Sequence, residues 1–147
     1  MPTEAKEYLG CVIGNFHIGI PVESVVEVFE TTMITRLPGY PEVFLGMINV
    51  RGNIIPLLDL WRASPASGII RAVVLATAEG GVGIRIDELM DLMYLSEAES
   101  PGSATESLKP WGAHFARSGG GDRSWHLMNV PSLITATCGD DNGKGPS

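Results

Sequence analysis

Short apolar segments separated by glycine-containing turns recur along the chain. Aliphatic and β-branched residues dominate these segments. This pattern is typical of strands rather than of long helices. The strands it predicts cover residues 8–16, 18–20, 44–50, 54–60, 69–77, 82–86, 89–95 and 125–130. Many short strands joined by such turns indicate an all-β fold built as a sandwich or as small barrels.

Some segments support more than one interpretation. Apolar residues over 22–29 stand at helical spacing, but Val25–Phe29 also suits a strand, so both readings stay open. Ser132–Thr137 is predicted to form a short closing helix. Pro56 lies inside a predicted strand and cannot donate a ladder hydrogen bond, so we expect that strand to lie at an edge or to carry a bulge.

Three segments rich in Gly, Ser, Glu or Pro are predicted to be loops, over residues 61–68, 96–110 and 118–123. The last nine residues, 139–147, are small and polar and can bury almost nothing. We therefore expect one domain over residues 1–138, followed by a flexible C-terminal tail.

The apolar pattern also repeats within the chain. Residues 19–28 align with residues 83–92 at an offset of 83 − 19 = 64, with glycine on glycine and acid on acid. Residues 57–60 resemble residues 127–130 at an offset of 127 − 57 = 70. A duplication of this kind predicts two similar small barrels, each too small to be stable alone, packed on a shared apolar seam. We expect the seam to include Val22, Val28, Ile48, Ile86 and Leu92.

Composition and charge argue against several classes of function. The 147 residues include 17 acidic and 10 basic ones, and the formal net charge is −7. The cations are scattered, which argues against nucleic acid and against direct membrane insertion or binding to an anionic membrane. The N-terminal residues lack a secretory signal, and no apolar run approaches the roughly 20 residues of a membrane helix. Cys11 and Cys138 form no CxxC pair and are expected to be reduced thiols, so a cytoplasmic location is predicted.

No constellation of reactive side chains points to catalysis. His17, His114 and His126 have neither HxxxH nor HExxH spacing, so we expect no metal site. The glycine clusters lack the residues of a phosphate-binding loop, and nothing assembles a nucleophile, a base and an orienting group. A small ligand-binding barrel would need convergent polar groups, which the sequence does not indicate. The prediction is a protein that is not an enzyme.

The most specific feature is the central stretch over residues 37–60. It contains Leu37-Pro38-Gly39, then Leu45-Gly46-Met47-Ile48-Asn49-Val50-Arg51-Gly52, then Ile55-Pro56-Leu57-Leu58-Asp59-Leu60. This stretch resembles the signature of the CheW family of chemotaxis coupling proteins. The resemblance extends over residues 19–28, 82–87 and, more weakly, 125–130, so it covers nearly all of the chain except its two tails.

The resemblance carries expectations about fold and function. It implies two SH3-like five-stranded barrels and an adaptor role without a cofactor. The implied partners are the signalling tip of a methyl-accepting chemoreceptor and the regulatory domain of a CheA-type histidine kinase, in arrays at the inner membrane. Glu88 replaces a usual glycine, and Trp61–Pro65 replaces a longer basic turn. These departures leave open a regulatory or scaffold module of a divergent kinase pathway, such as pilus motility. A regulatory domain released from a larger kinase or scaffold also stays open as an alternative.

The resemblance also implies partner-binding residues. Val25, Glu27, Met47 and Arg51 are expected near a receptor-facing groove, where Glu27 would hold the guanidinium of Arg51. The alternatives are that Val25 and Met47 belong to the core and that the ion pair is only structural.

A second group of motif residues is expected to shape the backbone. Gly46 and Gly52 would meet a demand for close packing or positive φ. Asp59 and Asp87 would accept backbone N–H bonds at strand ends. The full group is Gly46, Asn49, Gly52, Pro56, Asp59 and Asp87.

Overall fold

The structure is a computed structural model that describes residues 5–36, 38–39, 43–60, 68–78, 80–96, 114–118 and 125–139. Most of the predicted loops, Leu37 and residues 140–147 of the predicted tail lie outside these residues. The strands are β1 (Lys6–Ile13), β2 (Phe16–Pro21), β3 (Val25–Thr31), β4 (Phe44–Val50), β5 (Asn53–Leu58), β6 (Ile70–Thr77), β7 (Gly80–Ile86), β8 (Glu88–Leu95), β9 (Phe115–Ser118) and β10 (Trp125–Met128). A 3₁₀ turn, η1 (Val22–Ser24), a helix, α1 (Val130–Ile134), and a π-helical turn, η4 (Thr135–Gly139), complete the described elements.

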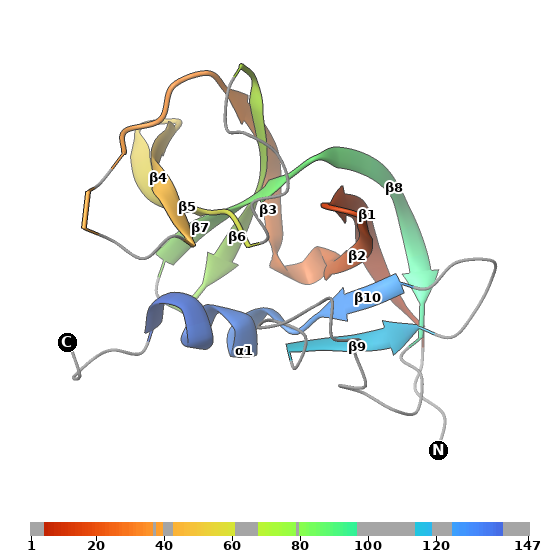
Figure 1. The fold of residues 1–147 in the computed structure, drawn as a ribbon. Helices are drawn as coiled ribbons and strands as arrows, with labels where there is room; N and C mark the ends of the chain where they lie inside the picture. Colours follow the sequence, from red (N-terminus) through yellow and green to blue (C-terminus); the bar gives the residue numbers. More distant parts are fainter. Residues whose placement is uncertain are drawn as a thin grey trace.

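The strands form two five-stranded sheets that curl into adjacent barrels (Figure 1). The first barrel has the strand order β3-β6-β7-β5-β4, and the second has the order β8-β1-β2-β10-β9. Thr35 pairs with Met47 beyond the end of β3 and so links the two edge strands of the first barrel. The predicted all-β fold of two small barrels is confirmed.

The two barrels have corresponding strand pairings. In the second barrel Tyr8 pairs with Pro21. In the first barrel Ala72 pairs with Arg85, and these two residues follow Tyr8 and Pro21 in the sequence by 64 positions each. A parallel contact joins Leu127 to Gly19 in the second barrel, and Leu57 to Gly83 in the first. These are the glycines and leucines that the sequence repeat aligns.

The two halves of the chain exchange strands. Strands β1–β5 correspond in order to β6–β10, yet each barrel takes two strands from one half and three from the other. The first barrel combines β3, β4 and β5 with β6 and β7, and the second combines β8, β9 and β10 with β1 and β2. Each half of the chain therefore completes the barrel of the other half.

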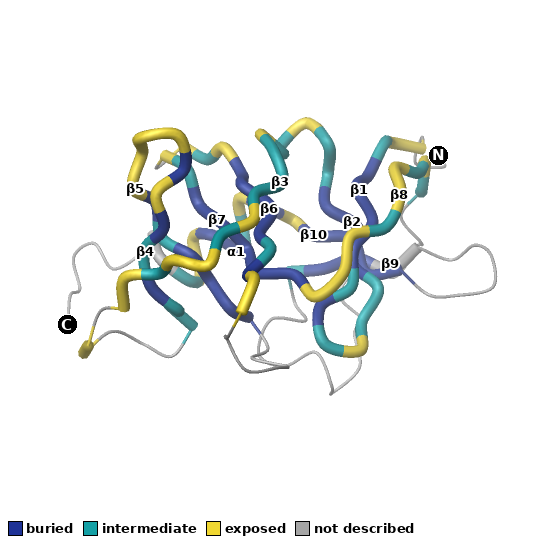
Figure 2. Tube along the Cα trace, turned by 90° about the horizontal axis from the view of Figure 1, so that it is seen from above, coloured by how far each residue is buried: buried dark blue, intermediate teal, exposed yellow. Residues whose placement is uncertain are grey.

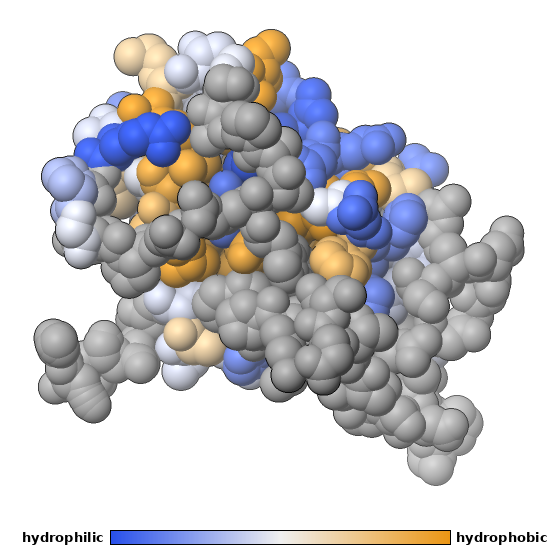
Figure 3. Space-filling model, viewed as in Figure 1, coloured by the Kyte–Doolittle hydropathy of each residue, from blue (hydrophilic) through white to orange (hydrophobic). Residues whose placement is uncertain are grey.

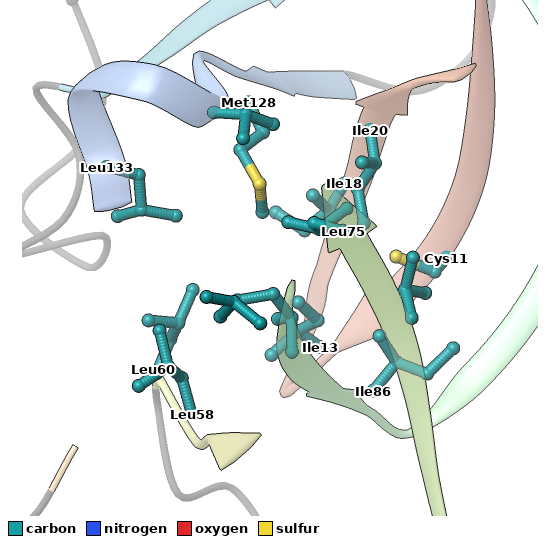
Figure 4. Packing of buried hydrophobic residues seen from close by; sticks show 14 of the residues in the cluster. Cys11, Ile13, Ile18, Ile20, Leu58, Leu60, Leu75, Ile86, Met128 and Leu133 are labelled. Carbon is teal, nitrogen blue, oxygen red and sulfur yellow. The ribbon is translucent and has the colours of Figure 1, made fainter. Parts of the chain in front are cut away.

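A large hydrophobic cluster lies where the barrels meet, as the side chains in Figure 4 show. It joins residues of β1 and β2 to residues of β5, β6 and β7, and α1 adds Leu133, which is fully buried. Ile86 belongs to this seam, and Val22 and Val28 pack against it.

Two of the predicted seam residues lie elsewhere. Ile48 is buried in a separate cluster within the first barrel, because its side chain faces inward from β4. Leu92 is 58% exposed on β8, an edge strand. The prediction was wrong for these two residues.

Each barrel also has an interior of its own. In Figure 3 hydrophobic atoms gather within the ring of β3–β7, with hydrophilic atoms around it. The interior of the second barrel is formed by Tyr8, Ala116, Trp125 and Leu127. Figure 2 shows the complementary pattern, in which the turn that leads into β5 is exposed while the strands beside the seam are buried.

The ambiguous segments resolve into a strand and a helix. Residues 22–24 form a single 3₁₀ turn, and the rest of that region is strand β3. The closing helix begins two residues earlier than predicted, because the Asn129 side chain accepts a hydrogen bond from the Ser132 backbone N–H and so caps it. Strand β9 was not predicted.

Pro56 does not mark an edge strand. Strand β5 lies between β7 and β4, so the expectation of an edge strand was wrong. The alternative, a bulge, occurs in the pairing of β4 with β5, where Leu45 of β4 is the extra residue. The pairs between β5 and β7 are at Leu57 and Leu58, beyond the proline, while Pro56 itself pairs with Met47 of β4. Because β5 does not pair with β7 at Pro56, the N–H that proline lacks is not needed for a ladder hydrogen bond to β7.

Candidate functional site

An ion pair joins β3 to the turn between β4 and β5. The Nε of Arg51 donates to Oε1 and Oε2 of Glu27 at 3.2 and 3.1 Å, and its Nη2 donates to Oε1 at 3.0 Å. The contact is bidentate, the geometry in which a guanidinium binds a carboxylate most strongly. Glu27 has 22% of its side chain exposed and Arg51 has 74%, so the carboxylate anchors a cation that faces solvent.

The turn that presents Arg51 is conformationally demanding. Arg51 and Gly52 form a two-residue turn with φ angles of 55° and 90°, both in the left-handed region that a tight hairpin of this kind requires. Glycine tolerates this conformation, whereas arginine is strained in it. The side chain of Asn49 supports the turn by accepting the backbone N–H of Gly52 at 2.8 Å.

A bulge in β3 positions Glu27. Val25 pairs with Leu75 of β6, but Glu27 pairs with the adjacent Val74, so Val26 is the extra residue between them. Val26 is 57% exposed, whereas Val25 packs against the seam. The bulge thus turns an apolar side chain outward beside the ion pair.

A cavity of about 670 Å³ lies beside this ion pair. Its described lining combines Glu27 and Arg51 with apolar residues of β3, β5 and β6, among them Val26 and Ile54. Ile54 is 59% exposed, so apolar surface flanks the charged pair. Neither Val25 nor Met47 is among the described lining residues. Of the four predicted partner-binding residues, the structure brings together Glu27 and Arg51.

The electrostatics of the pair favour its charged form. Hydrogen bonding to Glu27, and then the charge of that carboxylate, raise the pKa of Arg51 above its ordinary value. Arg51 is therefore a permanent cation, oriented by its partner. Such a group can select a carboxylate or a carbonyl oxygen on a docking protein.

Gly46 meets a demand for space. A Cβ atom at this position would lie 2.6 Å from the backbone oxygen of Thr35 and 2.6 Å from Cγ2 of Ile34. Thr35 forms the two backbone hydrogen bonds with Met47 that link the edges of the first barrel. A side chain at position 46 would push these edges apart.

The two motif aspartates hold different groups. Oδ2 of Asp87 accepts the backbone N–H of Gly14 at 2.6 Å, and the backbone N–H of Asp87 donates to Val12, so Asp87 ties β7 to the turn between β1 and β2. Oδ2 of Asp59 accepts Nη1 of Arg85 at 3.1 Å, with only 6% and 9% of the two side chains exposed. The sequence indicated a backbone contact for Asp59 and did not suggest this buried charge pair.

Sequence reasoning also missed exposed apolar residues. Val26 could not be told from Val25, since only the bulge decides which one faces out. The alternation of side chains along a strand could have identified Ile54 as exposed, because Ile55 lies on the buried face of β5. Strand β8 exposes Leu89, Leu92 and Tyr94 by 39, 58 and 70%.

Within the described residues, no group of three or more His, Cys, Asp or Glu side chains converges as metal ligands would. His17 packs edge-on against Trp125, and Nδ1 of His114 lies 2.6 Å from Oγ of Ser132. In the same part of the chain, no helix is long and apolar enough to cross a membrane.

Comparison with known proteins places this geometry in a family. The family model described as a CheW-like domain matches residues 7–138. The chain is 27% identical to the chemotaxis protein CheW of Klebsiella aerogenes over 141 residues, which cover 91% of this chain and 84% of that protein. It is also 27% identical to the chemotaxis protein CheW of Helicobacter pylori over 101 residues, which cover 65% of this chain and 61% of that protein, less than two thirds of its length.

A solved structure has the same fold. The scaffolding protein TtCheW from Thermoanaerobacter tengcongensis superposes with a TM-score of 0.70 at 20% sequence identity, over 91% of this chain and 93% of the other. The superposition extends the agreement in fold to both barrels.

Proposed function

The chain belongs to the CheW-like family of chemotaxis scaffold proteins, and on that premise we propose that it is a non-enzymatic adaptor joining a chemoreceptor tip to a CheA-type histidine kinase. The observation that carries the proposal is the family match over residues 7–138, which spans both barrels. The proposed place of action is the cytoplasm, at receptor arrays, without a cofactor.

The receptor contact is assigned to the surface around Glu27 and Arg51. A helical receptor tip needs apolar contact area together with a few polar anchors. Val26 and Ile54 supply exposed apolar area, and Arg51 supplies an anchored cation in the lining of the same cavity. Val25 packs against the seam and Met47 pairs with Pro56 and Thr35, so Val26 and Ile54 are assigned to the surface in their place.

The kinase contact is assigned to a separate surface, because one surface can hold only one partner at a time. At the far end of β3, Met33 is 77% exposed, and Ile69, next to the first residue of β6, is 66% exposed. Thr31 pairs with Ile70, which brings these two side chains to the same end of the first barrel. An exposed apolar barrel end of this kind suits docking of a similar barrel from the kinase.

A pull-down with the immobilised full chain tests the assignment. The partners are a soluble receptor signalling fragment and a CheA-type regulatory domain, each offered alone. Both are expected to bind the unmodified chain, and a Met33→Ser, Ile69→Ser double variant is expected to lose the kinase domain and keep the receptor fragment. Failure of either partner to bind the unmodified chain would contradict the adaptor role.

A further inference from the structure

The two barrels differ at one corresponding end. In the first barrel this end holds the buried pair of Arg85 and Asp59, whose atoms Nη1 and Oδ2 lie 3.1 Å apart. Arg85 lies two residues after Gly83 on β7, on the side of the strand that faces the barrel interior. The backbone N–H of Asp59 donates to the carbonyl of Val43 at 2.8 Å, which fixes the aspartate beside this end.

The second barrel has the same backbone frame with different side chains. Pro21 faces Tyr8 as Arg85 faces Ala72. The backbone N–H of Asn129 donates to the carbonyl of His114 at 2.8 Å, as Asp59 donates to Val43. Proline and asparagine thus replace the arginine and the aspartate, and the buried ion pair of the first barrel has no counterpart at these two positions.

A cavity of about 460 Å³ opens at this end of the second barrel. Buried apolar and aromatic side chains, including Tyr8, Phe115 and Leu127, form part of its wall. Polar groups from three separate segments also line it, namely Lys6, Ser24 and Asn129. An apolar wall with a few convergent polar groups is the usual composition of a small-ligand site.

The polar lining is rich in hydrogen-bond donors. Lys6 stands where the first barrel has Ile70, and His114 stands where it has Val43. Oδ1 of Asn129 already accepts the Ser132 backbone N–H at 3.0 Å, so this side chain presents its amide N–H groups as donors. Among the described lining residues, Glu23 is the one carboxylate.

We propose that this cavity binds a carboxylate that carries an apolar body. The carboxylate pairs with the Lys6 ammonium and accepts from Asn129 and Ser24, since bonds between charged groups and donors are the strong ones. The apolar body packs on Tyr8 and Phe115. The ligand is either a free organic acid or an acidic side chain of a partner segment. The inference does not depend on the adaptor function.

An amide-resonance titration of the full chain tests the proposal, with 4-methylpentanoate as probe and 4-methylpentanamide as its neutral match. The acid is expected to cause saturable shifts of the amide resonances of Tyr8, Phe115 and Asn129. The neutral amide is expected to bind at least tenfold more weakly. Lys6→Gln is expected to weaken binding of the acid at least tenfold and to leave the affinity for the amide unchanged. Arg71→Gln removes a cation of the first barrel and should leave the affinity for the acid unchanged.

A second arm separates the two sources of the carboxylate. The peptide acetyl-Leu-Glu-Leu-amide and its glutamine counterpart are titrated in the same way. Tighter binding of the glutamate peptide than of the free acid assigns the site to a partner segment, and the reverse order assigns it to a small molecule. The proposal is overturned if neither carboxylate shifts these resonances, if the neutral amide binds as tightly as the acid, or if Arg71→Gln weakens binding as Lys6→Gln does in variants with unchanged melting temperatures.

Discussion

Among single residues, Arg51 combines a strained backbone with an exposed, anchored charge. A non-glycine residue with φ of 55° persists only where its surroundings hold it, and here Asn49 and Glu27 do so. Backbone strain of this kind is common at functional sites. This is the structural reason to place the receptor contact at Arg51 rather than at another surface arginine.

Reversing the charge of Arg51 is predicted to weaken receptor binding by more than about 30-fold in Kd, the scale of a hot-spot residue. The double variant Glu27→Arg with Arg51→Glu should lose less than the sum of the single losses, because the two side chains interact directly. Fluorescence anisotropy with a labelled receptor fragment measures these affinities.

Arg71→Glu is the matched control for this series. Arg71 forms a comparable surface pair, with Nε 2.7 Å from Oε2 of Glu30, on the same sheet but outside the cavity beside Arg51. It should leave the receptor affinity within about twofold of the unmodified chain. Equal losses from Arg51→Glu and Arg71→Glu would show a general charge effect and contradict the site.

Cys11 gives a prediction about pH. Burial, and then the charge of Asp87, raise the pKa of its thiol from 9.0 to about 12. The folded chain therefore keeps a proton that the unfolded chain loses, so this stability is present below pH 9 and is lost as the pH rises toward 12. Urea midpoints of Cys138→Ser between pH 8 and 10.5 should fall more steeply than those of Cys138→Ser with Cys11→Ala. Parallel slopes would contradict the burial of this thiol.

At the residue scale, only part of the candidate site could be predicted from the sequence. Glu27 and Arg51 were expected together through the family resemblance, and the structure places them in contact. The exposure of Val26 was not expected, because a bulge leaves no signal in two adjacent valines. The pair of Asp59 with Arg85 was not expected, because Arg85 is distant in sequence and lies among apolar residues.

At the scale of elements, the buried pair of Asp59 and Arg85 fastens the end of β5 to β7. Asp59→Ala is predicted to destabilise the fold by about 3–5 kcal/mol, because it leaves a buried guanidinium without this partner. Replacing both residues, Asp59→Leu with Arg85→Met, should recover most of the loss. Urea unfolding measures both variants.

The exposed pair of Glu30 and Arg71 provides the comparison for the buried one. The two side chains are 52% and 37% exposed, so Glu30→Ala should change stability by at most about 1 kcal/mol. If Asp59→Ala cost no more than Glu30→Ala, the burial of the Asp59–Arg85 pair would be refuted.

Element prediction succeeded where the apolar pattern was continuous. Strands β4 to β8 were found within a few residues of their observed ends. Strand β9 was missed because only four residues pair, next to a glycine-rich segment. The position of β5 within its sheet was misjudged because Pro56 falls outside the stretch that pairs with β7, a matter of register that a single sequence does not contain.

For the whole molecule, the exchange of strands makes the two barrels one cooperative unit. Leu75 is fully buried in the seam, so Leu75→Ala is predicted to destabilise the chain by about 2–5 kcal/mol. Both barrels should unfold in one transition, as far-ultraviolet circular dichroism and the fluorescence of Trp125 in a Trp61→Phe, Trp111→Phe variant would report. Ile69→Ala, at a position that is 66% exposed, should change the free energy of unfolding by no more than about 0.5 kcal/mol. Two separate transitions would contradict the shared seam.

The internal repeat was the best guide to the overall architecture. Its offset of 64 residues reappears in the strand pairing of the two sheets, because the aligned glycines occupy the same register in each. The exchange of strands between halves could not be read from the repeat, since separate and interlocked barrels have the same pattern along the chain.

The adaptor role is tested most directly by the assembly of three components. A receptor signalling fragment and a CheA-type regulatory domain are mixed with or without the full chain, and complexes are separated by size-exclusion chromatography. If the chain is an adaptor, one complex with all three proteins is expected, and less regulatory domain should elute with the receptor fragment when the chain is absent. Competition of the two partners for the chain, so that each displaces the other, would contradict the account.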